Sequence, residues 1–347
     1  MTQILKYLNP ASLVLLLGVA IAFPFVADLN TANIAILALI FAAAATGWNI
    51  FSGYTGYVAL GHAAYFGVGA YTLAIICEHW KITDYYQPLY LIPVCGLVAG
   101  IFAIPLGAIA LRTRRHTFVV ITIATFFIMQ LMAYNLHDLT GGSAGKDLPL
   151  PNWTPDFYNA IFYFTTLAVT LIALGVSWFI RHSKYGLGLL AIRDDEDRAR
   201  GLGVPTGAFK LSAFVISAIF TGMAGAIFAY YLGSVQPQID FDALLDVALA
   251  LMVFMGGLGT LTGPILGALV LETAKIEITF QFSQDGVSLI LYGALFLGVI
   301  LLLPRGVVPT LQSLWRRYVV PLLTPPAAPT TLAKTATLTS PREEASV

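Results

Sequence analysis

Apolar runs long enough to cross a membrane follow one another along most of this chain of 347 residues. An α-helix needs about 20 mostly apolar residues to cross roughly 30 Å of hydrocarbon. Such runs are clear at residues 10–28, 32–51, 62–78, 88–111, 117–134, 158–180, 209–231 and 287–303. Every backbone polar group must be satisfied inside lipid, so we expect each run to be helical. The sequence therefore predicts an all-α polytopic membrane protein with about eight to ten transmembrane helices.

One further apolar stretch, residues 241–278, is too long for a single span. It is interrupted by a run of glycines that ends in Gly263 and Pro264. Glycine and proline favour a break in a helix. We therefore expect two shorter helices that meet at a turn, which brings the number of spans to ten.

The placement of basic residues supports ten spans, because cytoplasmic loops of membrane proteins carry an excess of Lys and Arg. With both termini in the cytoplasm, only Lys81, Lys146 and Lys275 of the 18 Lys and Arg residues fall outside. Nine spans would move the basic residues near 305–317 to the outer side. We therefore expect both termini to be cytoplasmic.

The composition excludes several classes of protein. Only 10% of the residues are charged and 58% are hydrophobic, whereas soluble domains carry about 25% charged residues. A soluble enzyme is therefore excluded. The 18 basic residues balance the 18 acidic ones, so no nucleic-acid-binding surface is expected. Cys77 and Cys95 lie in apolar stretches without ligand spacing, so we expect no disulfide and no metal site.

The chain divides into a transmembrane permease domain, residues 1–320, and a tail, residues 321–347. The tail is rich in Pro, Ala, Thr and Ser and poor in bulky residues, so we expect it to be disordered. Within the domain, residues 181–210 form the longest polar segment on the predicted cytoplasmic side. This segment is the sharpest candidate for contact with a partner.

Residues 189–203 within that segment are predicted to form a short amphipathic helix that ends in glycine. Arg193 and Asp197, or Asp194 and Arg198, have the i,i+4 spacing of ion pairs on its polar side. Such a helix could be gripped by a partner protein, or it could lie on the bilayer surface. Four consecutive acidic residues argue against an anionic membrane surface.

A segment rich in small residues follows the second predicted span. Gly53 and Gly56 favour an irregular re-entrant connection, which is tolerated at membrane depth only where protein or water covers the backbone. Gly61, Gly67 and Gly69 could permit close packing of helices or could contact a transported solute directly. Close packing is the favoured interpretation.

Few polar side chains fall inside the predicted spans. His62 is a candidate functional residue because ionisable groups at membrane depth usually have a role, with a satisfied interfacial histidine as the alternative. Asn49, Gln130 and Asn135 could line a solute route or make interhelical hydrogen bonds. Asp246 is the lone acidic residue expected inside a span, so an ion-driven pump is disfavoured.

Two segments look like nucleotide-binding motifs but lack the necessary context. Residues 140–147 have Thr in place of the first glycine of a P-loop and Asp147 in place of the hydroxyl that binds magnesium. Residues 186–191 fit a loose dinucleotide pattern, yet no strand precedes them. The chain offers no catalytic residues and no ATP-binding motif of its own, so we expect it not to be an enzyme.

Four motifs, taken in order, resemble those of the permease subunits of branched-chain amino acid ABC importers, the LivM-like family. They are residues 53–71, 139–145, 191–203 and 256–268, and the resemblance covers roughly residues 32–310. It implies a bacterial inner-membrane subunit that pairs with a second permease, in a heterodimer. The partners are completed by two cytoplasmic ATPases and an extracytoplasmic substrate-binding protein. The resemblance further implies that the chain binds no cofactor and that ATP is hydrolysed by the partner subunits.

The resemblance also assigns residues to two roles. The third motif matches the family's coupling segment, which transmits closure of the ATPases; its residues are Ile192, Arg193, Asp194, Asp195, Glu196, Ala199 and Gly203. The remaining motifs supply residues of the translocation path or of helix packing: Gly53, Gly56, Gly61, His62, Gly67, Gly69, Tyr71, Gly141, Gly142, Gly256, Gly257, Gly259, Gly263 and Pro264. The chain departs from the family around the coupling segment, so we expect a contact specific to its own ATPase.

The expected function is therefore that of a permease subunit of an ABC importer. It would move a small polar solute into the cytoplasm, most readily a branched-chain or other amino acid, with urea or a short amide left open. The alternative is a secondary transporter that works alone on an ion gradient, and a membrane-embedded enzyme comes last. Scarce intramembrane charge disfavours the secondary transporter, and an enzyme would need clustered His, Asp or Cys at one membrane depth, which the sequence does not offer.

Overall fold

The computed structural model describes residues 10–82, 85–282, 286–302, 306–310 and 313. Within them the chain is almost entirely helical. Its two strands, β1 (Lys146–Asp147) and β2 (Ser234–Val235), have two residues each and pair antiparallel. The all-α prediction is confirmed. The tail predicted to be disordered, residues 321–347, lies outside the described residues.

Long helices occupy every predicted span within the described part of the chain. They are α2 (Pro10–Val26), α3 (Leu29–Trp48), α4 (His62–His79), α5 (Gln87–Ala110), α6 (Arg115–Asn135), α8 (Pro155–His182), α11 (Thr206–Leu232), α13 (Ala243–Gly256), α14 (Gly263–Gln281) and α15 (Val287–Leu302). Short elements connect them: η1 (Asn49–Gly53), α7 (His137–Thr140), η2 (Gly142–Ala144), α9 (Lys184–Asp194), α10 (Glu196–Gly201) and α12 (Pro237–Asp240). The break predicted inside residues 241–278 falls between α13 and α14 and is confirmed.

Five of these helical segments are long and apolar enough to cross a membrane: Leu29–Gly53, Gln87–Ala110, His116–Asn135, Pro155–His182 and Thr206–Leu232. Other helices on predicted spans are shorter, such as α13 with 14 residues, or carry several charges, such as α14. The chain is therefore a multi-pass membrane protein, as predicted.

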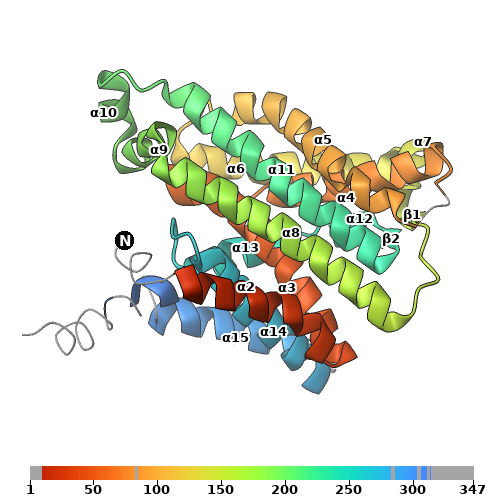
Figure 1. Ribbon diagram of the computed structural model, residues 1–347. Helices are drawn as coiled ribbons and strands as arrows, with labels where there is room; N and C mark the ends of the chain where they lie inside the picture. Colours follow the sequence, from red (N-terminus) through yellow and green to blue (C-terminus); the bar gives the residue numbers. More distant parts are fainter. Residues whose placement is uncertain (1–9, 83–84, 283–285, 303–305, 311–312, 314–347) are drawn as a thin grey trace, which may run out of the picture.

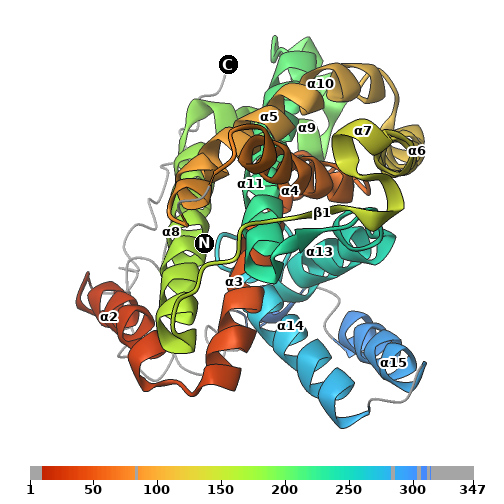
Figure 2. The same cartoon turned by 90° about the vertical axis from the view of Figure 1, so that its right-hand side faces the viewer.

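α8 and α11 run along the bundle from α9 and α10 at one end to the β1–β2 pair at the other (Figure 1). We call these the α10 end and the β end. α11 is central, because it contacts α3, α4, α5, α8 and the helical turn η1. Figure 2 looks onto the β end, where α3 and α14 spread apart below α11. The short elements at the α10 end therefore rest on a helix that touches most of the bundle.

Paired small residues bring α4 and α11 into close contact. A Cβ on Gly69 would collide with the backbone of Gly222, and one on Gly225 would collide with the backbone of Phe66. Helices in lipid associate largely through such van der Waals packing, because apolar burial provides little driving force there. Gly69 therefore packs helices together, which is the interpretation favoured from the sequence.

The connection between η1 and α4 is irregular over residues 56–61, as predicted. α4 then begins inside the bundle, since His62 is fully buried beside Ser217 of α11. Ser217 lies about 16 Å along α11 from Thr206, at 1.5 Å per residue. The chain thus turns back into the protein interior before α4 starts.

Replacing Gly69 by valine should force α4 away from α11. Overpacking a close contact typically costs roughly 1 to 3 kcal/mol, so the thermal transition of the detergent-solubilised protein should fall by several degrees. Gly175→Val is the matched control, because a side chain at that exposed position of α8 meets nothing within 4 Å. Equal transition temperatures for the two variants would contradict the packing role.

Candidate functional site

The polar segment between α8 and α11 folds into two short helices. Asp195 has extended backbone angles, φ −158° and ψ 109°, and its carboxylate accepts hydrogen bonds from the N–H groups of Asp197 and Arg198, both at 3.0 Å. This is an N-cap, which starts a new helix at Glu196. The prediction of one continuous helix is therefore wrong. The helix breaks at Asp195, whose side chain accepts hydrogen bonds from the first N–H groups of α10.

The ion pairs of this segment also differ from the prediction. In place of the i,i+4 pairs Arg193–Asp197 and Asp194–Arg198, the structure has Arg198 with Asp195 at 3.1 Å and Arg200 with Glu196 at 3.4 Å. The break at Asp195 changes the direction of the chain, so residues on either side no longer share one helix face. Ile192 and Ala199 face inward and are buried, whereas Gly203 is exposed with φ 86°.

Arg193 points into the bundle and reaches two glycine turns. Its guanidinium donates a hydrogen bond to the Gly53 carbonyl at 2.8 Å. A Cβ on Gly56 would lie 3.0 Å from the Arg193 Cγ, and one on Gly259 would lie 2.5 Å from its Nη1. Gly56 and Gly259 also have left-handed backbones, with φ 72° and 73°. Glycine at these positions lets the arginine side chain lie against the backbone.

Asn49 joins the same two turns to each other. Its Nδ2 donates to the Thr260 carbonyl at 2.9 Å, and its Oδ1 accepts from the Gly259 N–H at 2.8 Å. Arg181 at the end of α8 donates to the Gly259 carbonyl. Of the two predicted roles for Asn49, the structure shows hydrogen bonding between segments. Residues 53–56 and 257–260 therefore form one hydrogen-bonded unit beneath α9, which we call the glycine junction.

Glu196 anchors α10 to α11 and to the chain just after the glycine turn. Lys210 Nζ lies 2.6 Å from Glu196 Oε1, and the hydroxyl of Tyr57 donates to Glu196 Oε2. Lys210 Nζ also lies 4.5 Å from the centre of the Tyr57 ring. Burial by itself raises the pKa of Glu196, but hydrogen bonds from Lys210 and Tyr57 and the charges of Lys210 and Arg200 outweigh it. The pKa therefore lies below its ordinary value.

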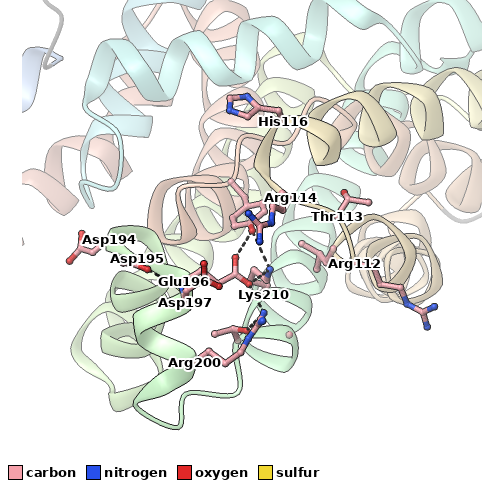
Figure 3. A pocket seen from close by; sticks show the side chains of 14 residues that line it. Arg112, Thr113, Arg114, His116, Asp194, Asp195, Glu196, Asp197, Arg200 and Lys210 are labelled. Carbon is pink, nitrogen blue, oxygen red and sulfur yellow. Dashed lines mark hydrogen bonds and ion pairs between the residues drawn. The ribbon is translucent and has the colours of Figure 1, made fainter.

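A groove of about 610 Å³ lies between this segment and the connection from α5 to α6. Figure 3 shows the acidic run 194–197 on one side, with Arg112, Arg114 and His116 across from it. Asp194 and Asp197 are exposed, unlike Arg193 and Glu196. The outer face of α9 and α10 thus presents charged side chains, while the inner face holds the glycine junction.

His62 lies in the protein interior, where its side chain is fully buried. Its Nε2 is 2.7 Å from Ser217 Oγ. Asp246 Oδ1 accepts the N–H groups of His62 and Ala63 at 2.7 and 3.1 Å. These are the first N–H groups of α4, and the positive end of a helix favours a carboxylate. α13 is therefore fixed to the start of α4 through Asp246.

Further predicted residues pack around Phe241, which precedes α13. A Cβ on Gly67 would collide with the Phe241 ring, and the ring of Tyr71 lies 5.8 Å from it between centroids. Gln130 donates to the Phe241 carbonyl at 2.6 Å. Asn135, by contrast, donates to a carbonyl of its own helix. Gln130 therefore connects two segments, whereas the hydrogen bond of Asn135 lies within α6.

The other predicted residues shape turns and helix ends, and the structure does not gather them into one site. Gly141 and Gly142 have left-handed backbones at the β end, while Gly61 packs against the Thr122 backbone of α6. Gly256 and Gly263 meet backbone to backbone across the break, Gly257 has φ 120°, and Pro264 occupies the first turn of α14. Among the residues predicted for the translocation path or helix packing, Gly53, Gly56 and Gly259 lie against Arg193 of the predicted coupling residues.

The sequence did not reveal several charged contacts. Glu272 is 2% exposed inside α14 and pairs with Lys275 at 3.2 Å. The expectation that Asp246 is the lone acidic residue inside a span is therefore wrong. An i,i+3 pair of opposite charges within an apolar stretch is the signal that would have identified it. Tyr57 and Lys210 carry no comparable signal, because their partner is 139 and 14 residues away in the chain.

Comparison with known proteins finds a family of transport permeases and relatives within it. A family model described as branched-chain amino acid transport system / permease component matches residues 30–301. The high-affinity branched-chain amino acid transport system permease protein LivM of Escherichia coli (strain K12) is 28% identical over 323 residues, which cover 86% of this chain and 74% of LivM. LivH of Salmonella typhimurium, named as a permease protein of the same transport system, is 25% identical over 77% of this chain and 90% of its own length.

A more distant kind of system also matches in part. The autoinducer 2 import system permease protein LsrC of Yersinia pseudotuberculosis is 30% identical over 183 residues, which cover 51% of this chain and 50% of LsrC. No solved structure matches the chain. The relatives thus share the permease role while their named solutes differ.

Replacing Glu196 by glutamine should destabilise the protein, because it leaves the ammonium of Lys210 buried without its counter-charge. We expect a loss on the order of 2 kcal/mol, measured by thermal unfolding in detergent at pH 7. The folded-state pKa of Glu196 is lowered, so its contribution is complete above the ordinary carboxyl pKa of about 4.3 and is lost as the pH falls below it.

The difference between wild type and Glu196→Gln should therefore shrink in acid. Asp197→Asn is the matched control, since this neighbouring carboxylate is exposed. A Glu196→Gln protein as stable as the control at pH 7 would contradict the anchoring role.

Proposed function

Since the chain belongs to the family of branched-chain amino acid transport system permease components, we propose that it is the permease subunit of an ABC importer. Cytoplasmic partner ATPases supply the energy, because the glycine-rich segments of this chain form turns and helices and no nucleotide-binding motif of its own is expected. The solute is an amino acid, with a branched-chain amino acid as the first candidate.

The proposed assembly contains a second, related permease in a heterodimer, two ATPases and an extracytoplasmic substrate-binding protein. It lies in the bacterial inner membrane, with both termini and the α10 end in the cytoplasm. Arg112, Arg114, Arg193, Arg198 and Arg200 all lie at the α10 end, in agreement with the excess of basic residues on cytoplasmic sides. The β end then faces the binding protein.

One observation carries the proposal: α9 and α10 have an exposed, charged outer face and an inner face bonded to the glycine junction and to α11. Asp194 and Asp197 are exposed on the outer face. Arg193 and Glu196 make the inner contacts, to Gly53 and Lys210. A segment held in this way can be pushed from outside and can pass the displacement inward.

The displacement would reach the centre of the bundle through three attachments. Gly53 ends η1, Gly259 lies in the break between α13 and α14, and Lys210 lies in the first turns of α11. Asp246 of α13 in turn holds the start of α4. ATP binding in the partner would thereby bias a rigid-body switch between two arrangements of the helices.

A secondary transporter remains the second candidate, because Asp246 and Glu272 are buried carboxylates of the kind that bind coupling ions. Such a transporter would work without an ATPase. Uptake that persists in a strain lacking the ATPase genes and collapses with the ion gradient would establish it. Uptake that requires the ATPases would exclude it.

Reversing Asp194 and Asp197 together to lysine should abolish association with the ATPases. Both side chains are exposed, so the protein should still insert and keep its unfolding temperature. We expect at least a tenfold loss of ATPase subunits in a mild-detergent pull-down of the tagged protein, with a matching loss of uptake.

The matched control is Asp138→Lys, an exposed charge reversal beyond α6 at the β end. It should retain the ATPases. Full retention of the ATPases by the Asp194/Asp197 variant would contradict the docking surface, and a pull-down of wild type that recovers no ATPase would contradict the proposed function.

A further inference from the structure

A second groove, of about 690 Å³, lies between α3, α11 and α14. Most of its lining is apolar, including Phe41, Phe228, Ile276 and Phe280. Two charged side chains, Glu272 and Lys275, also line it, and we call it the α14 groove. An apolar cavity of this size with a few converging polar groups is typical of a small-molecule site.

The groove runs toward the β end. Glu272 lies about 13 Å along α14 from Gly263, at 1.5 Å per residue, and Phe280 precedes the last residue of the helix. Leu232, the last residue of α11, also lines the groove. Figure 2 shows α3 and α14 spreading apart as they leave the centre of the bundle. The groove therefore leads from the β end to a charged pair at the middle of α14.

The charged pair has unused capacity for hydrogen bonds. The Glu272 side chain is 3% exposed; its Oε1 lies 3.2 Å from Lys275 Nζ, and its Oε2 has no partner among the described residues. Lys275 is 42% exposed in its side chain and lies 5.3 Å from the centre of the Phe41 ring. An ammonium group has three donors, and Glu272 uses one of them. A buried carboxylate oxygen without a partner is costly unless something completes it.

An amino acid with an apolar side chain matches this arrangement group by group. Its ammonium can donate to the Glu272 carboxylate, its carboxylate can accept from Lys275, and its side chain can pack against Phe41, Phe228 and Ile276. The pair is neutral overall, so a zwitterion leaves no unbalanced charge in the groove. Urea or a short amide could hydrogen-bond to both groups but carries no charge to balance either of them.

We propose that the α14 groove is a binding site for a zwitterionic amino acid with an apolar side chain, on its route through the permease. This inference rests on the proposed function, in which the β end faces the binding protein that delivers the solute. Phospholipid tails fit the apolar lining but provide nothing for Glu272. A second permease seated on the groove is an outcome that the experiment below distinguishes.

The test uses the assembled importer in proteoliposomes, with its binding protein and ATP. The probe is photo-leucine, a leucine analogue that carries a photoactivated diazirine in its side chain. After illumination, mass spectrometry of the permease locates the label. We expect label on groove residues of α3, α11 or α14, reduced at least tenfold by excess L-leucine. Excess 4-methylpentanoate, which lacks the ammonium group, should not reduce it.

Glu272→Gln and Lys275→Met should each lower the groove labelling about tenfold, as expected for a lost hydrogen bond to a charged group. Glu277→Gln is the matched control, because Glu277 lies on the same helix, is exposed and does not line the groove. It should be labelled like wild type. Co-purification of the second permease should be unchanged in all three variants.

Several results would overturn the inference. Label that L-leucine does not displace, or that both groove variants retain, means that the groove does not bind the zwitterion. Loss of the second permease from both groove variants assigns the charged pair to subunit contact instead. A wild-type importer that takes up leucine without groove label overturns the inference alone. A wild-type complex that takes up no leucine contradicts the branched-chain amino acid as the proposed solute and the inference with it.

Discussion

The hydrogen bond from the Arg193 guanidinium to the Gly53 carbonyl is the contact on which the arrangement at the α10 end depends. It requires glycine at Gly56 and Gly259, because side chains there would displace the arginine. Both glycines have left-handed backbones and lie in the irregular connections before α4 and between α13 and α14. A single charged side chain on the surface segment therefore packs against the connections that precede two helices, α4 and α14.

Two features make this region suitable for transmitting movement. The surface segment is attached at both of its helices, through Arg193 on α9 to the glycine junction and through Glu196 on α10 to α11. The interior attachments are a hydrogen bond from Arg193 to the Gly53 carbonyl and side-chain contacts of Glu196 with Lys210 and Tyr57. Closer to the centre, Asp246 fixes α13 to the start of α4. A displacement at the α10 end would therefore also shift the residues around the buried His62.

Much of the fold follows from the sequence, because apolar length and glycine breaks have direct physical consequences in a membrane. The helix boundaries and the break before Gly263 follow from these alone. The break at Asp195 could not be foreseen, since an aspartate in a helical pattern can either continue the helix or cap a new one. Long-range contacts such as Tyr57 with Glu196, or Asn49 with Thr260, leave no local pattern. The role of Gly53 and Gly56 beside the coupling segment was therefore visible only in three dimensions.

The most direct test of the account is to replace Arg193 by methionine in the full importer and to measure ATP hydrolysis and leucine uptake in the same proteoliposomes. The account predicts that the ATPases stay bound and hydrolyse ATP while uptake falls at least tenfold. Without the Arg193 hydrogen bond, a displacement of α9 and α10 is no longer transmitted to the glycine junction. Unchanged uptake would contradict the account. Loss of the ATPases from the complex would also contradict it, because Arg193 would then serve docking and not transmission.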